Sequence, residues 1–170
     1  EIFGNMTTSV QKKDNILIYT PSLGDCNFKN IEFDTVLNFD DFERSNGRNV
    51  NFNGKKIAVI GDSHTMGWGV EDNETFSAIL EESIKQKVYN LGVSSYATER
   101  KFIRLINHSN FKKIETIFAQ YCDNDFSENT NFPVNIDIGA ARYKDAMKSY
   151  KINQSNTLGR VFFRFIQGLY

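Results

Sequence analysis

The sequence has few of the residues that cross-link a chain or bind metals, with two cysteines and two histidines among 170 residues. Cys26 and Cys122 lie far apart and form no CxxC pair, which argues against a zinc ribbon or a thioredoxin-like motif. They are therefore predicted to be two free thiols, with a single disulfide as the alternative, and Cys122 is expected to be buried at a strand end. The two histidines and the scattered carboxylates show no metal-ligand spacing, so neither a metal nor a cofactor is expected.

Long apolar runs and an excess of one charge are also absent. Twenty basic residues stand against 21 acidic ones, and this balance argues against nucleic acid or an anionic membrane surface as the main partner. No run of eighteen apolar residues occurs, so no membrane-spanning helix is expected. The first residue is Glu1 rather than Met, which indicates a processed chain or part of a longer protein. A chain of this length suits one domain, or one domain with a small extension.

Residues 1–54 have the pattern of a β-rich N-terminal extension. The apolar segment 16–19 stops near Pro21, and apolar and polar residues alternate along 28–39. Alternation with a period of two is typical of a strand that has one buried face. We therefore expect this extension to form β structure laid against a main domain of residues 55–170.

From Lys55 onward, predicted strands alternate with predicted helices. This order predicts an α/β domain with right-handed crossovers and a parallel sheet. One helix is expected to begin with Thr98 as its cap and to bury Phe102, Leu105 and Ile106. The expected strands are 57–60, 88–91 and 114–121, and the expected helices are 74–87 and the one after Thr98.

After Asn124 the sequence turns polar and is expected to be irregular as far as Gly139. Helices are expected near 140–150 and over 157–169. The second has a long apolar stripe, which either packs on the domain or contacts a missing segment or a partner.

Three residues with useful chemistry follow the three predicted strands of the main domain. Ligands of parallel α/β sheets collect beyond the carboxyl ends of the strands. Ser63 offers a hydroxyl, Gly92 an accessible backbone N–H and Asn124 a side-chain amide. Each alone is an ordinary cap, turn or loop residue, but together they could supply a nucleophile and the donors of an oxyanion hole. The glycines near Ser63 lack the lysine of a P-loop, and the Gly-x-Ser-x-Gly elbow of α/β-hydrolases is absent.

Three segments resemble the sequence blocks of the SGNH (GDSL-type) hydrolases. Residues 59–70 (VIGDSHTMGWGV) are similar to the first block, 89–97 (YNLGVSSYA) to the glycine block and 121–126 (YCDNDF) to the asparagine block. The resemblance covers roughly 55–126 and is specific, because the blocks occur in the right order.

The resemblance implies a flavodoxin-like three-layer α/β/α fold with a parallel sheet. The fold is either complete or lacks its C-terminal part in this chain. The resemblance also implies Ser63 as the catalytic nucleophile, with the Ser63 N–H, the Gly92 N–H and the Asn124 amide as the oxyanion hole. It also implies an ester substrate, such as an acylated glycan, and a bacterial cell envelope or periplasmic location.

The catalytic Asp-x-x-His block of that family is absent from this sequence. His64 is adjacent to Ser63, so its side chain is expected to diverge from the hydroxyl. His108 is expected to be a surface or capping residue. The leading hypothesis is a serine esterase or O-acyltransferase whose acid–base half lies outside this chain. The alternative is a non-catalytic glycan-binding, ligand-binding or assembly module that has lost the Asp–His pair.

Overall fold

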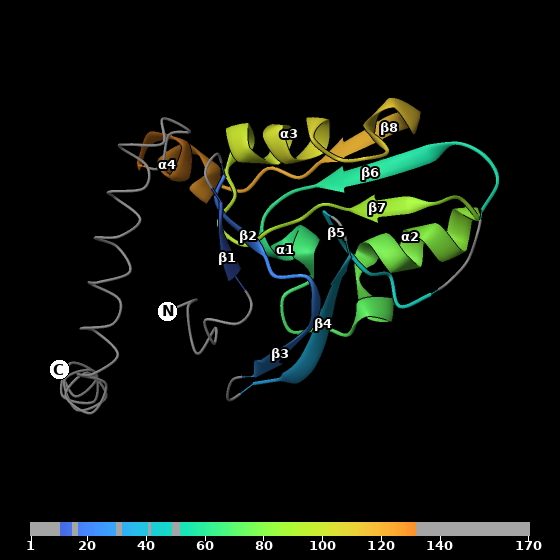
Figure 1. The fold of residues 1–170 in the computed structure, drawn as a ribbon, viewed down its shortest axis with the longest axis horizontal. Coiled ribbons are helices and arrows are strands. Elements are labelled where there is room, and N and C mark those ends of the chain that lie inside the picture. The colour runs from blue at the N-terminus through green and yellow to red at the C-terminus, as the bar shows by residue number, and fades with distance from the viewer. Residues whose placement is uncertain (1–10, 15–16, 30–31, 41, 49–51, 132–170) are drawn as a thin grey trace, which may run out of the picture.

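The computed structural model describes residues 11–14, 17–29, 32–40, 42–48 and 52–131. The helices predicted near 140–150 and over 157–169 lie outside the described residues. The described part is an α/β fold with four α-helices and a six-stranded mixed sheet (Figure 1). The strands are β1 (Gln11–Asp14), β2 (Ile18–Pro21), β3 (Gly24–Lys29), β4 (Asp34–Asp40), β5 (Glu43–Arg44), β6 (Lys56–Ile60), β7 (Val88–Asn90) and β8 (Ile114–Ala119). The helices are α1 (Ser63–Met66), α2 (Phe76–Ile84), α3 (Thr98–Ile106) and α4 (Asn124–Asn131), with short 3₁₀ turns at Asp72–Glu74 and Phe111–Lys113.

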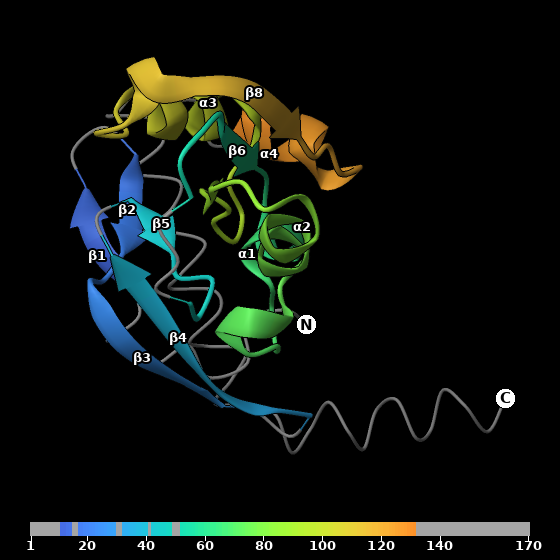
Figure 2. The ribbon, with the colours of Figure 1, turned by 90° about the vertical axis from the view of Figure 1, so that its right-hand side faces the viewer.

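The main sheet has the strand order β3-β4-β5-β7-β6-β8. Strands β7, β6 and β8 are parallel, as predicted, because each is connected to the next through a helix. The prediction of a parallel sheet is wrong for the sheet as a whole. Strands β3, β4 and β5 form an antiparallel meander, and the Arg44–Asn90 pair joins it to β7. Part of the N-terminal extension thus continues the sheet, while β1 and β2 form a separate hairpin (Figure 2).

Helices α2 and α3 cover opposite faces of β6 and β7 (Figure 1). On one face Leu105 of α3 packs with alternate strand residues, and on the other Leu80 and Ile84 of α2 pack with the intervening ones. Burial on both faces explains why β6 reads as a continuous apolar run. The strand residues are Ala58, Ile60, Tyr89 and Leu91 on the α3 side, and Ile57, Val59 and Val88 on the α2 side.

Helix α3 buries Leu105, as predicted, but not Phe102 or Ile106. Phe102 and Ile106 are 46% and 55% exposed, whereas Arg100, Lys101 and Arg104 are buried. The apolar spacing fails as a guide because the side of α3 that carries Arg104 and Lys101 meets β2 and α4 rather than water. Thr98 is also not the cap, since the helix takes Ala97 at that position and no side-chain capping bond forms.

The buried cations of α3 have polar partners on its neighbours. Arg104 Nη1 donates to the hydroxyl of Thr20 on β2 at 3.1 Å. Lys101 Nζ donates to Asp125 Oδ2 on α4 at 2.5 Å. A buried charge is tolerated where it is paired or hydrogen-bonded. Asp125 supplies an ion pair to Lys101, and Thr20 supplies a hydrogen-bond acceptor to Arg104.

The hairpin of β3 and β4 packs against the chain that follows β6. Alternate residues of β4 are buried, including Thr35 and Leu37, which confirms the predicted alternation. Leu37 and Phe28 form a core cluster with Met66 of α1, and Trp68 packs edge-on against Phe28 with ring centroids 4.4 Å apart. The hairpin therefore supports the segment that begins at Ser63.

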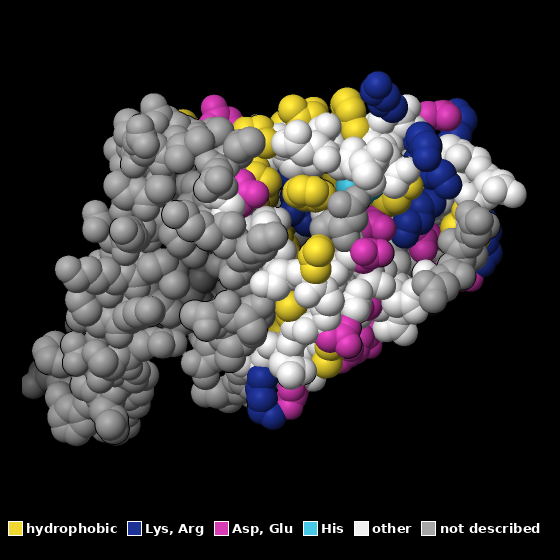
Figure 3. All heavy atoms as spheres, viewed as in Figure 1, with side chains coloured by type: hydrophobic (Ala, Val, Ile, Leu, Met, Phe, Trp, Pro, Cys, Tyr) yellow, Lys and Arg dark blue, Asp and Glu magenta, His cyan; other side chains and the backbone are white. Residues whose placement is uncertain are grey.

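Strand β8 is an edge strand of the main sheet. Among the described strands it pairs only with β6. The sequence predicted a strand here, but Ile117 and Phe118 remain 43% and 50% exposed. Apolar side chains also reach the surface over α3 (Figure 3). Among the described helices, none is long and apolar enough to cross a membrane.

Candidate functional site

Ser63 is the first residue of α1, directly after the central parallel strand β6. Asp62 caps this helix, and its Oδ1 accepts the backbone N–H of His64 at 2.9 Å. The Ser63 side chain is half-buried, and its hydroxyl has no hydrogen-bond partner within the described ranges. A hydroxyl placed in this way is available to an incoming group.

Gly92 follows β7 and lies against the backbone of α1. A Cβ at Gly92 would come within 2.3 Å of the Met66 nitrogen and 2.6 Å of the Thr65 carbonyl carbon. Glycine is therefore required for the two segments to approach so closely. The Gly92 N–H donates to Asn90 Oδ1 at 3.1 Å, so this predicted oxyanion donor already has a partner.

Asn124 begins α4 after β8, and its side chain is exposed. The expectation of irregular structure after Asn124 is wrong for this segment. Helix α4 is anchored by Asp125, whose side chain forms a buried ion pair with Lys101 of α3. Lys101 also donates to the carbonyl of Gln120 at 3.0 Å, which ties the end of β8 to the same cation.

The three predicted site residues follow three neighbouring strands at one edge of the sheet. Ser63 comes from the central strand β6, Gly92 from β7 on one side and Asn124 from β8 on the other. Parallel strands end at the same edge, so these loops border a common region. Their roles as nucleophile and oxyanion donors remain predictions.

Neither histidine reaches the Ser63 hydroxyl. The His64 side chain is 77% exposed, and its Nδ1 lies 3.2 Å from Asp62 Oδ1. His108 follows α3 and packs on the ring of Tyr89 with centroids 4.7 Å apart. The expectation of a surface position for His108 is wrong because it is buried, although its Nδ1 does accept the N–H of Asn110.

Gln120 is a site residue that the sequence reading missed. Its Oε1 accepts the Thr65 hydroxyl at 2.8 Å and the Asp62 N–H at 3.3 Å. These donors fix the orientation of the amide, and its Nε2 then donates to Cys122 Sγ at 2.8 Å. A Cβ on Gly61 would come within 2.5 Å of Gln120 Oε1, so Gly61 makes room for this amide. The only sequence signal is a polar residue directly after an apolar strand.

Asp62, His64 and Cys122 form a compact cluster beside Ser63. Cys122 Sγ lies 3.5 Å from His64 Nδ1, and each residue offers one ligand atom within 4.8 Å of the others. Both cysteines are free thiols, as predicted, but Cys122 is half-exposed rather than buried.

The ionisable groups of the cluster shift in opposite directions. Burial raises the pKa of Asp62, but hydrogen bonds from the His64 backbone, the Cys122 thiol and the His64 ring outweigh it and leave that pKa below its usual value. Burial and the hydrogen bond to Asp62 raise the pKa of the Cys122 thiol. The cluster therefore favours a charged carboxylate and a protonated thiol.

Arg44 was also missed, and it holds the segment that follows α1. It is 1% exposed and donates to the carbonyls of Met66, Gly67 and Val70 and to the carboxylate of Asp72. A single guanidinium thus fixes the carboxyl end of the first site helix.

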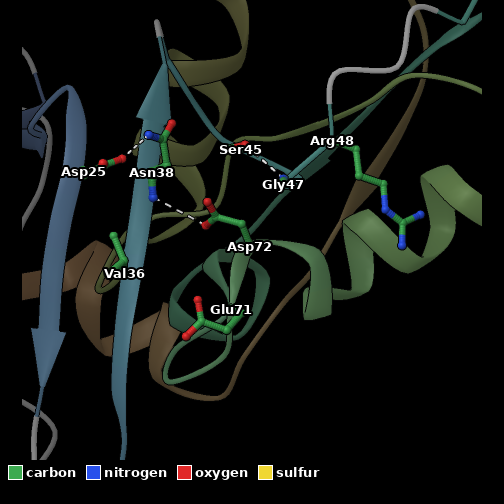
Figure 4. A pocket seen from close by; sticks show the side chains of 8 residues that line it. All are labelled: Asp25, Val36, Asn38, Ser45, Gly47, Arg48, Glu71 and Asp72. Atoms are coloured by element: carbon green, nitrogen blue, oxygen red, sulfur yellow. Dashed lines mark hydrogen bonds between the residues drawn. The ribbon is translucent and has the colours of Figure 1, made fainter.

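A separate polar cavity of about 400 Å³ lies between the β3–β4 hairpin and the 3₁₀ turn at Asp72–Glu74 (Figure 4). Asn38 bridges it by bonding Asp25 with its side chain and Asp72 with its backbone N–H. None of the three predicted site residues lines it, so it does not mark the region around Ser63. Its lining residues are Asp25, Val36, Asn38, Ser45, Gly47, Arg48, Glu71 and Asp72.

The replacement Glu128→Gln on α4 is expected to increase the free energy of unfolding at pH 7. Burial raises the pKa of Glu128, nearby Arg100 lowers it, Asp125 and Asp62 raise it, and the net shift is upward. A carboxyl whose pKa is higher in the folded state than in the unfolded state lowers the stability of the protein as the pH rises above the unfolded-state pKa. Urea unfolding of both proteins between pH 4 and pH 7 should show the advantage of the variant shrinking at low pH. A variant less stable than the wild type at pH 7 would show that the pair with Arg100 outweighs burial.

A scan against protein-family models and a search of curated proteins found no match to this chain.

Proposed function

We propose that this chain carries the nucleophile half of a serine esterase or O-acyltransferase built on an SGNH-type, flavodoxin-like α/β/α scaffold. The observation that carries the proposal is the placement of Ser63, Gly92 and Asn124 after three neighbouring parallel strands. The Ser63 hydroxyl has no hydrogen-bond partner among the described residues, which leaves it free to attack a substrate. Acylated glycans of a bacterial cell envelope are the substrate class that we favour.

The proposed reaction has two acyl-transfer steps. The Ser63 oxygen attacks the ester carbonyl, and the N–H groups of Ser63 and Gly92 with the Asn124 amide bind the resulting oxyanion. Collapse of this intermediate expels the alcohol and leaves an acyl-serine. Water or a sugar hydroxyl then attacks the acyl-serine, which restores Ser63 and releases the acid or a new ester. The proposal requires a base from outside these 170 residues, because the His64 ring contacts Asp62 and the His108 ring packs on Tyr89, and neither bonds the Ser63 hydroxyl.

A non-catalytic module that binds an acylated ligand is the second candidate. Two observations favour it: the Gly92 N–H is engaged by Asn90, and neither histidine bonds the Ser63 hydroxyl. A serine without a base is a weak nucleophile at neutral pH.

Labelling with a fluorophosphonate, with and without added imidazole, separates the two candidates. Attack by Ser63 expels fluoride and leaves a phosphonyl ester that mass spectrometry can locate. We expect slow labelling alone and about tenfold faster labelling with imidazole, because a general base contributes roughly 10²–10⁴-fold to such steps.

Two serine variants complete this experiment. Ser63→Ala should abolish the adduct, whereas Ser83→Ala on the exposed side of α2 should leave it unchanged. A folded wild-type protein that stays unlabelled in imidazole would refute the acyl-transfer proposal and favour the binding module.

A further inference from the structure

We infer that Asp62, His64 and Cys122 form a Zn²⁺ site with one open coordination position, next to Ser63. The three side chains come from the cap of α1, from its first turn and from the loop after β8. They offer one carboxylate oxygen, one imidazole nitrogen and one sulfur. The sequence spacing gave no hint of this site, because Cys122 stands 58 positions after His64.

The two distances from His64 Nδ1 to the other ligand atoms match those between the ligands of a tetrahedral zinc ion, and all three ligand atoms lie within 4.8 Å of one another. Zinc bonds of about 2.0 Å to oxygen and nitrogen and about 2.3 Å to sulfur place neighbouring ligand atoms about 3.3 Å (N···O) and about 3.5 Å (N···S) apart. His64 Nδ1 lies 3.2 Å from Asp62 Oδ1 and 3.5 Å from Cys122 Sγ. An ion could therefore replace the two hydrogen-bond contacts of His64 Nδ1 without moving the imidazole away from either neighbour.

The surrounding groups hold two of the three ligands in place. Asp62 is buried, and the His64 backbone N–H fixes its carboxylate. The Gln120 amide donates to Cys122 Sγ and is itself oriented by the hydroxyl of Thr65. Donors of this kind orient metal ligands. A bound ion would take the place of the proton that burial and Asp62 favour on the Cys122 thiol, because cysteine binds metals as the thiolate.

The ligand set selects the ion. One sulfur, one imidazole and one carboxylate suit borderline Zn²⁺, whereas Mg²⁺ and Ca²⁺ prefer oxygen ligands alone. Three protein ligands leave a fourth position for water or for an oxygen of a bound molecule. The His64 side chain is largely exposed and Cys122 is partly exposed, so an ion can reach the cluster from solvent.

Two of the three ligands, Asp62 and His64, are the sequence neighbours of Ser63. A zinc ion there would place a Lewis acid beside the Ser63 hydroxyl. The inference does not rest on the proposed acyl transfer, because a binding module could hold the same ion.

Cobalt is the probe that tests the site, because Co²⁺ replaces Zn²⁺ and reports its ligands by absorption. Tag-free protein with reduced thiols should bind one Co²⁺ with a sulfur-to-cobalt charge-transfer band in the near ultraviolet and the visible bands of a tetrahedral ion. One equivalent of Zn²⁺ should remove both. Cys122→Ser should abolish the charge-transfer band, and His64→Phe should weaken binding at least tenfold.

Matched controls identify the ligands. Cys26→Ala removes the other thiol, and Asp123→Asn removes an exposed carboxylate beside Cys122, so both should keep the spectrum and affinity of the wild type. Asp62→Asn is a poor test because Asp62 also caps α1. The inference is overturned if folded wild-type protein gives no sulfur band, or if the band survives in Cys122→Ser. A lack of fluorophosphonate labelling in a protein that binds cobalt would refute the acyl transfer alone.

Discussion

Replacing Arg44 by Met should lower the free energy of unfolding by about 3–5 kcal/mol, the usual cost of removing one partner of a buried ion pair. Arg44 Nε lies 2.9 Å from Asp72 Oδ1, and its terminal nitrogens donate to the carbonyls of Met66, Gly67 and Val70. Met fills much of the same volume but leaves these four acceptors without their donor. Urea unfolding followed by circular dichroism measures the difference.

Arg48→Met is the matched control, because Arg48 makes a more exposed ion pair with Glu82. Exposed pairs contribute about 0–1 kcal/mol, so this variant should unfold close to the wild type. Equal losses in the two variants would mean that the buried bonds of Arg44 add nothing to stability.

Gly92→Ala should be similarly damaging, with a loss of about 3 kcal/mol or more, because overpacking against a fixed backbone costs about 1–3 kcal/mol even where side chains can yield. The added Cβ would meet backbone atoms of Thr65 and Met66, and α1 must move to admit it. The shift should also change the surroundings of Ser63. Thermal unfolding measures the stability, and fluorophosphonate labelling in imidazole measures the effect on the site.

Gly24→Ala controls for the loss of a glycine as such. Its Cβ would meet nothing within 4 Å, and only its positive φ opposes the change, at a cost of about 1–2 kcal/mol. If Gly92→Ala were no worse than Gly24→Ala, the close approach of β7 and α1 would not be a constraint on the fold.

The sequence predicted the parallel strands well because each contains adjacent apolar residues and is followed by a glycine or a polar residue. Strands β6, β7 and β8 all occur within a few residues of the expected bounds. Their order along the chain also predicted that Ser63, Gly92 and Asn124 would share one edge. Those features depend on local pattern and on the handedness of crossovers, both of which are readable from sequence.

Helix α3 shows why its buried face could not be predicted. Hydrophobic spacing assumes water on the far side of a helix. Here Thr20 and Asp125 meet Arg104 and Lys101 instead, and these partners are distant in sequence. Pairing between such distant residues leaves no periodic signal.

The mixed sheet and the cluster of Asp62, His64 and Cys122 could not be predicted for a similar reason. Strand β5 is two residues long, and its single pair to β7 carries no pattern of its own. The approach of Cys122 to His64 follows from the pairing of β8 with β6, a tertiary fact rather than a local one.

The hydrogen bonds of Arg44 also affect how the protein unfolds locally. Arg44 lies on β5, which joins the antiparallel strands to β7, and its guanidinium holds the carbonyls that end α1. Local unfolding of β4 and β5 would therefore release the chain after Ser63 at the same time. Segments that open together share one opening free energy, so we expect these two parts to open as a single cooperative unit despite their separation in sequence.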